Sequence, residues 1–220
     1  MTEKIAFFDF DDTLCRGDSI LPYLLYCVRR GAAPWHQVLR ALWGYLGWRV
    51  NPARATSAKN LTLSYLAGRS QADMDALGRD FFREKLEKRF FPAGRAELNR
   101  LRAEGFRLVV VTASADAYMR LLPEFLPVDD VIATRCAQDQ QGRYTGEVGE
   151  NCKGEEKPRR IRAWLDAQGL EEPDWAACRA YGDSLSDAPM LSLVGHPVLV
   201  DPGKPLTEKL PAAERVHWHE

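Results

Sequence analysis

The sequence predicts an α/β protein built on a parallel sheet, with a helical unit inserted near its beginning. Three observations support this fold class. Apolar runs of strand length recur along the 220 residues, and helix-period segments separate the later runs. A block of roughly 75 residues after the first run shows no strand pattern, which is too long for a loop. Strands that alternate with helices along a chain favour a parallel sheet.

Five apolar runs have the length of buried strands. They are Ile5–Phe8, Leu108–Val111, Val131–Ala133, Arg179–Tyr181 and Val198–Val200. Four segments with helical periodicity lie between these runs, one before each of the four later strands. They are Ala93–Arg102, Asp116–Leu126, Glu155–Gln168 and Asp187–Leu193. A glycine or a proline follows each segment, as expected where a helix ends.

The strandless block predicts an inserted helical subdomain. Its expected helices are Leu21–Arg29, Gln37–Trp48, Thr56–Leu66 and Gln71–Arg89. Ser70 is a suitable N-cap for the last of these, with Asp73 three residues later. A shorter insertion, Cys136 to Gly149, contains two glycines around a polar turn and predicts a hairpin.

Composition excludes several classes of protein. The net charge of -1 gives no general attraction to nucleic acid, and 45% hydrophobic residues suffice for a full core. The five cysteines are odd in number and form no CxxC pair, which favours reduced thiols in a cytoplasmic protein. Acidic residues interrupt the place of a signal peptide's apolar region. The longest apolar stretch, Val38–Trp48, is much shorter than the roughly 20 residues of a spanning helix.

The charge is unevenly distributed. Between Cys15 and Asn60 there are seven Lys or Arg residues and one acid, Asp18, together with several Trp and Tyr side chains. We consider three interpretations of this stretch: ordinary packing with a solvated basic face, steering of an anionic substrate, or contact with an anionic membrane surface.

Two carboxylates stand directly behind the first predicted strand, at Asp9 and Asp11. Like charges this close resist joint ionisation unless a cation lies between them or one keeps its proton. Such a costly arrangement at the end of a buried strand indicates chemistry rather than structure.

Further polar residues follow the later strands. Thr112-Ala113-Ser114 follows the second strand, Lys157 lies at the start of a helix, and Asp183 and Asp187 follow the fourth strand. Ligands of an open parallel sheet collect outside the carboxyl ends of its strands. We therefore expect these groups at one edge of the sheet.

This set of groups suits phosphoryl transfer. One carboxylate can attack phosphorus, while a second carboxyl protonates the leaving alkoxide and then activates water. A divalent cation held by oxygen ligands offsets the repulsion between nucleophile and phosphate. A hydroxyl, a lysine and backbone N–H groups can hold the non-bridging oxygens.

These residues, in this order, resemble the haloacid dehalogenase-like (HAD) phosphatase superfamily from Ile5 to about Leu206. The resemblance implies a Rossmann-like core with strand order 5-4-1-2-3 and an aspartyl-phosphate intermediate on Asp9. It implies that Asp11 is the general acid/base, and that Thr112, Ala113 and Lys157 bind the phosphoryl group. The implied Mg²⁺ ligands are Asp9, Asp11 through its backbone carbonyl, Asp183 and Asp187, the last directly or as an anchor.

The helical insertion resembles a C1 cap, and the chain is similar to the phosphoserine-phosphatase-like subclass IB. The implied division is a core of residues 1–15 and 92–220 and a cap of residues 16–91. Asp18 matches a position that senses substrate in that subclass, or it caps the following helix. Lys153 is the rival of Lys157 for the lysine role, and Ser114 either replaces Thr112 at the phosphate or caps a helix.

The predicted activity is that of a phosphoric monoester hydrolase. A soluble small phosphorylated metabolite is the first choice of substrate, and a lipid phosphate at a membrane surface is the alternative, because the chain also resembles the phosphatidylglycerophosphate phosphatase branch. A phospho-acceptor signalling domain, which would stop after one equivalent of phosphate, is the more distant alternative. No nucleic-acid partner is expected.

Overall fold

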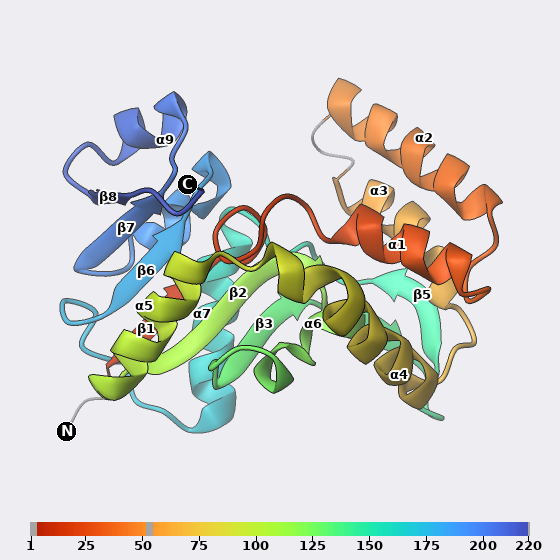
Figure 1. The fold of residues 1–220 in the computed structure, drawn as a ribbon, viewed down its shortest axis with the longest axis horizontal. Helices are drawn as coiled ribbons and strands as arrows, with labels where there is room; N and C mark the ends of the chain where they lie inside the picture. The colour runs from red at the N-terminus through yellow and green to blue at the C-terminus, as the bar shows by residue number, and fades with distance from the viewer. Residues whose placement is uncertain (1–3, 52–54, 220) are drawn as a thin grey trace.

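A six-stranded parallel sheet forms the centre of the protein (Figure 1). The computed structural model describes residues 4–51 and 55–219. The strand order is β3-β2-β1-β6-β7-β8. The strands are β1 Ile5–Phe8, β2 Arg107–Ala115, β3 Asp130–Thr134, β6 Arg179–Gly182, β7 His196–Val200 and β8 Glu214–Val216. The predicted order of five strands is confirmed, and β8 adds an edge strand that was not predicted.

Both faces of the sheet are buried. In β1, Ala6 and Phe8 belong to one cluster of buried apolar residues, whereas Ile5 and Phe7 belong to another. This follows from the two-residue period of a strand, which sends successive side chains to opposite faces. Helices on the two sides cover these clusters: α5 Pro92–Ala103, α6 Asp116–Met119, α7 Glu156–Gln168, α8 Ala188–Leu191 and α9 Lys204–Lys209.

The helix predicted over Asp116–Leu126 was wrong in its length. The helix α6 ends at Met119, and a separate 3-10 turn spans Leu122–Glu124. Pro123 lies within that turn, and proline has no N–H to donate to the carbonyl four residues earlier. The predicted segment Asp187–Leu193 is likewise a 3-10 turn, Leu185–Asp187, followed by α8.

Four helices occupy most of the described chain between the loop after β1 and the start of α5. They are α1 Ile20–Arg29, α2 His36–Val50, α3 Ala55–Leu63 with a 3-10 turn Ser64–Leu66, and α4 Gln71–Phe81, continued by the turns Phe82–Leu86 and Glu87–Arg89. The Ser70 cap is confirmed, because its Oγ accepts the N–H of Asp73 at 3.1 Å. Helices α1, α2 and α3 lie together to one side of the sheet (Figure 1).

The predicted hairpin is confirmed as β4 Cys136–Gln138 and β5 Tyr144–Val148. It packs on the inserted helices rather than extending the central sheet. The N–H of Tyr144 donates to the carbonyl of Arg69 at 3.0 Å, and the N–H of Val148 donates to Asn60 Oδ1 at 2.7 Å. The hairpin therefore gives the inserted helices a second connection to the core.

All five cysteines are buried, with free thiols. Among the helices that the structure describes, none has both the length and the hydrophobicity to cross a bilayer.

Candidate active site

Asp9 lies where β1 leaves the sheet. Its backbone N–H donates to the carbonyl of Tyr181 at 2.9 Å, which continues the pairing of β1 with β6 beyond the end of β1. The residue is 9% exposed. Strand pairing therefore fixes the backbone of Asp9 beside the Gly182–Asp183 segment at the end of β6.

Lys157 is buried between two carboxylates. Its Nζ lies 2.7 Å from Asp9 Oδ1 and 2.6 Å from Asp187 Oδ1, and the side chain is 1% exposed. Burial alone would lower the pKa of Lys157, but the charges of Asp9 and Asp187 hold that pKa above its ordinary value. The lysine is therefore a fixed cation in the first turn of α7. It contacts Asp9 after β1 and Asp187 after β6.

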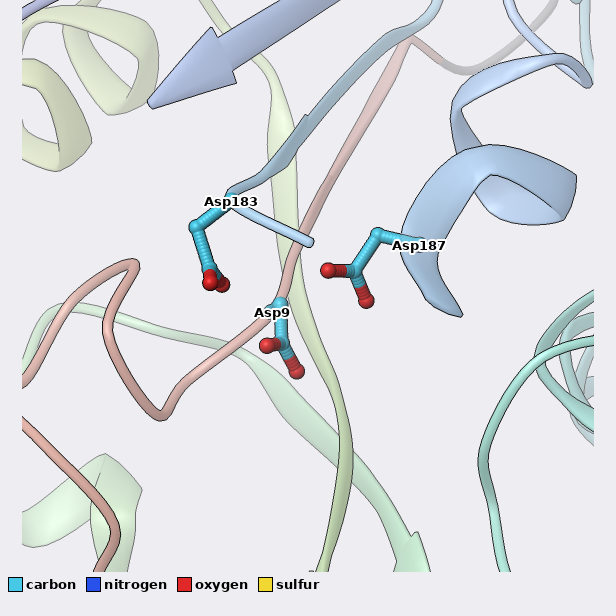
Figure 2. A group of neighbouring side chains, drawn as sticks. All are labelled: Asp9, Asp183 and Asp187. Atoms are coloured by element: carbon cyan, nitrogen blue, oxygen red, sulfur yellow. The ribbon is translucent and has the colours of Figure 1, made fainter. Parts of the chain in front are cut away.

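The side chains of Asp9, Asp183 and Asp187 lie close together at this edge of the sheet (Figure 2). One oxygen of each lies within 4.8 Å of the others. Thr13 Oγ1 donates to Asp183 Oδ1 at 3.0 Å and fixes that carboxylate from the loop after β1. Burial, with the charge of Asp187, raises the pKa of Asp9 to about 6, and burial, with the charge of Asp9, raises that of Asp183 to about 7.

The loop after β6 is shaped by a close approach. A Cβ atom on Gly182 would lie 2.6 Å from the Cβ of Asp187, so only glycine fits there. Asp187 Oδ2 accepts the backbone N–H of Ser184 at 3.0 Å, as part of a capping box between the two residues, and it also accepts the Ser184 hydroxyl at 2.7 Å. Because Oδ1 accepts from Lys157, both oxygens of Asp187 already have donors.

The donor set of this cluster suits a hard divalent cation. Mg²⁺ prefers oxygen ligands, and it is usually bound by one or two carboxylates together with substrate oxygens and water. Asp9 and Asp183 offer such carboxylates, and burial together with neighbouring negative charge raises the pKa of both, so a cation between them would favour their joint ionisation. The residues present therefore fit the predicted metal.

Asp11 lies in a second polar group, connected to β2. Ser114 Oγ donates to Asp11 Oδ2 at 2.6 Å, and Ser19 Oγ lies 3.0 Å from the Ser114 hydroxyl and 2.7 Å from the Tyr118 hydroxyl. The other oxygen, Oδ1, is buried, and no described residue hydrogen-bonds to it. Burial, with the charge of Asp18, raises the pKa of Asp11 to about 7.

The segment Thr112–Ser114 lies inside β2 rather than after it. The register with β3 shifts between Val111 and Ala115, which indicates a bulge. Thr112 Oγ1 accepts the N–H of Ser114 at 3.0 Å, and the Ala113 carbonyl accepts from Thr134 Oγ1 at 2.7 Å. The interpretation of Ser114 as a helix cap was wrong, because Ala115 precedes α6 and the Ser114 hydroxyl bonds to Asp11.

A cavity of about 200 Å³ opens beside Asp11. Core residues and residues of α1, α2 and α3 line it together, including Ile20, Ala41, Lys59, Ser114 and Lys153.

Asp18 also lines this cavity, and its Oδ1 accepts the N–H of Leu21 at 3.1 Å. The position of Asp18 agrees with both of its interpretations. It caps the first turn of α1, and it lines the cavity where a substrate could be sensed. Lys153 lies at the cavity as well, whereas Lys157 lies among the carboxylates.

Lys59 is a polar cavity residue that the sequence did not single out. Its Nζ donates to the carbonyl of Ala113 and to Asn151 Oδ1, and it lies 3.4 Å from Thr134 Oγ1. Burial lowers the pKa of this lysine to about 8, although the charge of Asp11 opposes the effect. A lone lysine in a helix carries no spacing signal, so only the fold could reveal this position.

The family model of the haloacid dehalogenase-like hydrolases matches residues 6–192. The chain belongs to this family. The match contains both carboxylates of the first loop, Lys157 and the acidic loop after β6, so the resemblance proposed from the motifs is confirmed.

Curated relatives in this family include named phosphatases. Phosphoserine phosphatase SerB1 of Mycobacterium tuberculosis (strain ATCC 25618 / H37Rv) is 29% identical over 203 residues, covering 90% of this chain and 64% of the relative. Histidinol-phosphatase of Neisseria meningitidis serogroup C (strain 8013) is 24% identical over 211 residues, covering 94% of each protein. The chain thus spans about two thirds of the length of the first relatives it matches.

Solved structures support the same fold. A Bordetella pertussis Tohama I protein of unknown function has a TM-score of 0.84 at 26% identity, covering 98% of this chain and 99% of that chain. A phosphoserine phosphatase with a phospho-aspartyl intermediate analogue has a TM-score of 0.63 at 19% identity, covering 100% and 95%. The likeness to the second structure shows a shared fold.

Proposed function

We propose that this chain is a Mg²⁺-dependent phosphomonoesterase that works through an aspartyl-phosphate on Asp9. The observation that carries the proposal is the buried ion-pair group in which Lys157 contacts both Asp9 and Asp187 beside Asp183. A lysine so placed keeps Asp9 ionised despite burial, as a carboxylate nucleophile requires.

Each residue then has a chemical role. A carboxylate oxygen of Asp9 attacks phosphorus while the bond to the ester oxygen breaks. Asp11 gives its proton to the leaving alkoxide, and its raised pKa of about 7 supports a protonated carboxyl near neutral pH. Asp11 then takes a proton from the water that attacks the aspartyl-phosphate, which regenerates Asp9 and releases phosphate.

The metal would be held by the carboxylates of Asp9 and Asp183 and by the backbone carbonyl of Asp11. A bound Mg²⁺ supplies positive charge that offsets the repulsion between the nucleophile and the phosphoryl oxygens. Asp187 has donors on both oxygens, which supports a role in positioning Lys157. Thr112, Ala113 and Lys157 would bind the phosphoryl group.

We propose residues 16–91 as a cap over the site and residues 1–15 and 92–220 as the core, with residues 52–54 outside the described part. Cap residues such as Ile20 and Lys59 line the cavity beside Asp11, which supports this division. The free thiols support a cytoplasmic location.

A compact soluble phosphoester is the substrate that the cavity supports best, because its volume is only about 200 Å³. Asp18 would contact the part of the substrate that leaves with the ester oxygen. The names phosphoserine phosphatase and histidinol-phosphatase among the relatives support a small substrate with an amino group. A lipid phosphate is the second candidate, because α2 carries an exposed apolar face beside the same cavity.

The test is hydrolysis of an aryl phosphate in the presence of Mg²⁺. We expect multiple turnovers for the wild-type chain and loss of activity in Asp9→Asn. Asp166→Asn, an exposed aspartate of α7, is the matched control and should keep wild-type turnover. Release that stops at one equivalent would indicate a phospho-acceptor domain, and wild-type turnover in Asp9→Asn would refute the role of Asp9.

A further inference from the structure

The helix α2 has an apolar face that the structure leaves uncovered. The five apolar residues of this face are between 47% and 87% exposed. They are Leu39, Leu42, Trp43, Leu46 and Val50. These positions are three or four residues apart, so at about 100° per residue they occupy an arc of roughly 100°. We call these five residues the α2 stripe.

The opposite face of α2 packs inward. Gln37, Ala41 and Gly44 are buried, and Gln37 Nε2 donates to the carbonyl of Thr62 at 3.2 Å and to Ser64 Oγ at 3.0 Å. These contacts hold α2 on α3, which leaves α2 as the outer helix of this group (Figure 1). The α2 stripe therefore faces outward because the other side of α2 already packs against the protein.

Basic side chains flank the α2 stripe. Arg40 and Arg49 are exposed, and their positions on the helical wheel lie on opposite sides of it. Neither forms an ion pair with a described residue. Residues 19–72 contain no Asp or Glu in the sequence, so no acid from this stretch neutralises them. The surface thus combines apolar, aromatic and positively charged groups.

We propose that the α2 stripe docks on the surface of a bilayer containing anionic phospholipid. A helix with Trp and Leu on one face and Arg at its borders suits the plane of a membrane interface. Anionic headgroups attract flanking basic residues with about fivefold in binding per residue. The positive charge of Arg40 and Arg49 beside the stripe favours an anionic bilayer over a neutral one.

A second copy of the chain is a weaker occupant for the same surface. Pairing two α2 stripes across a twofold axis would bring Arg40 and Arg49 of both copies together in a partly dehydrated interface. Residues 19–72 supply no carboxylate to offset that repulsion.

Docking would also orient the active-site cavity. Ala41 and Tyr45 of α2 line the cavity that contains Asp11, so one helix carries both the cavity wall and the stripe. The docking proposal does not depend on the phosphatase chemistry and would survive the loss of Asp9 activity.

The experiment is co-sedimentation of the full chain with vesicles. One set contains equal parts of phosphatidylcholine and phosphatidylglycerol, and the other contains phosphatidylcholine alone. We expect binding to the anionic vesicles that weakens as salt is raised. Trp43→Ser should reduce binding about tenfold, and Arg40→Glu should reduce it at least about fivefold.

Matched controls separate the stripe from general stickiness. Leu185→Ser removes an apolar side chain that is 52% exposed outside α2, and Arg162→Glu reverses an exposed charge on α7. Both should bind as wild type does, and circular dichroism should confirm that all variants are folded. Absence of vesicle binding, equal binding to both vesicle types, or loss of binding in the controls would overturn the proposal. A dimer in analytical ultracentrifugation that Trp43→Ser dissociates would reassign the stripe to self-association.

Discussion

Replacing Lys157 by methionine removes the cation but keeps most of the side-chain volume. Two carboxylates, Asp9 and Asp187, then lose a partner at 2.7 and 2.6 Å in a site where the lysine is 1% exposed. Breaking a buried ion pair from one side costs about 3–5 kcal/mol. For a chain of this size that lowers the melting temperature by roughly 6–20 °C.

The loss should depend on pH with a definite sign. The pKa of Asp9 is raised from 3.8 to about 6 in the folded protein even with Lys157 present. Between about pH 4 and about pH 6 the folded state therefore keeps a proton on Asp9 that the unfolded chain has already released. The free energy of unfolding falls as pH rises through this window. Without Lys157 the pKa of Asp9 rises further, so Lys157→Met should be most destabilised near about pH 8 and least near about pH 4.

Urea denaturation in metal-free buffer measures the stability of this variant, and aryl phosphate hydrolysis with Mg²⁺ measures its turnover. We expect turnover to fall by about 100-fold or more, as when a donor to developing charge is removed. Lys153→Met is the matched control at the cavity and should keep the stability of the wild type. Wild-type stability and turnover in Lys157→Met, with both lost in Lys153→Met, would transfer the lysine role to Lys153.

Four other predictions rest on the same geometry. Asp11→Asn should release at most one equivalent of alcohol and stall as phosphoenzyme; sustained turnover would contradict the acid/base role. Because burial raises the pKa of Asp11 to about 7, its charge opposes folding above that pH, and metal-free Asp11→Asn should exceed wild-type stability by about 1–3 kcal/mol near about pH 8 but not near about pH 4. Mg²⁺ should raise the melting temperature near about pH 8 and lose this effect near about pH 5, because protons then occupy Asp9 and Asp183; an equal shift in Asp183→Asn would exclude that residue as a ligand. Lys59→Met should raise KM for an anionic phosphoester with little change in kcat, and an unchanged KM in steady-state kinetics would separate Lys59 from substrate binding.

The part of the site that the sequence predicted well depends on strand ends. Asp9 and Asp183 follow apolar runs that pair as β1 and β6, and parallel pairing alone brings their carboxylates to one edge. Lys157 was predictable from the family pattern, because it lies at the start of a helix whose end is marked in the sequence by Gly169. In the structure this glycine has the left-handed backbone that favours glycine at a helix end.

Other features had no signal of this kind. The role of Ser114 depends on the bulge in β2, which changes the direction of side chains without a change in composition. Lys59 reaches Ala113 from an inserted helix, a contact between residues 54 apart that follows from how the helices pack on the core. The edge strand β8 has the sequence Glu-Arg-Val, which lacks the apolar run used to find strands. In contrast, the short helix α6 was predictable, because Pro123 stands inside the segment assigned to it.

Identification of the residue that carries the phosphoryl group tests the proposed chemistry most directly. The Asp11→Asn variant should be mixed with an aryl phosphate and Mg²⁺, quenched in acid, digested and analysed by mass spectrometry. We predict one added phosphoryl group on the peptide that contains Asp9, and none when Asp9 is also replaced by asparagine. A phosphoryl group on any other residue, or turnover by the wild-type chain with Asp9 never modified, would contradict Asp9 as the nucleophile.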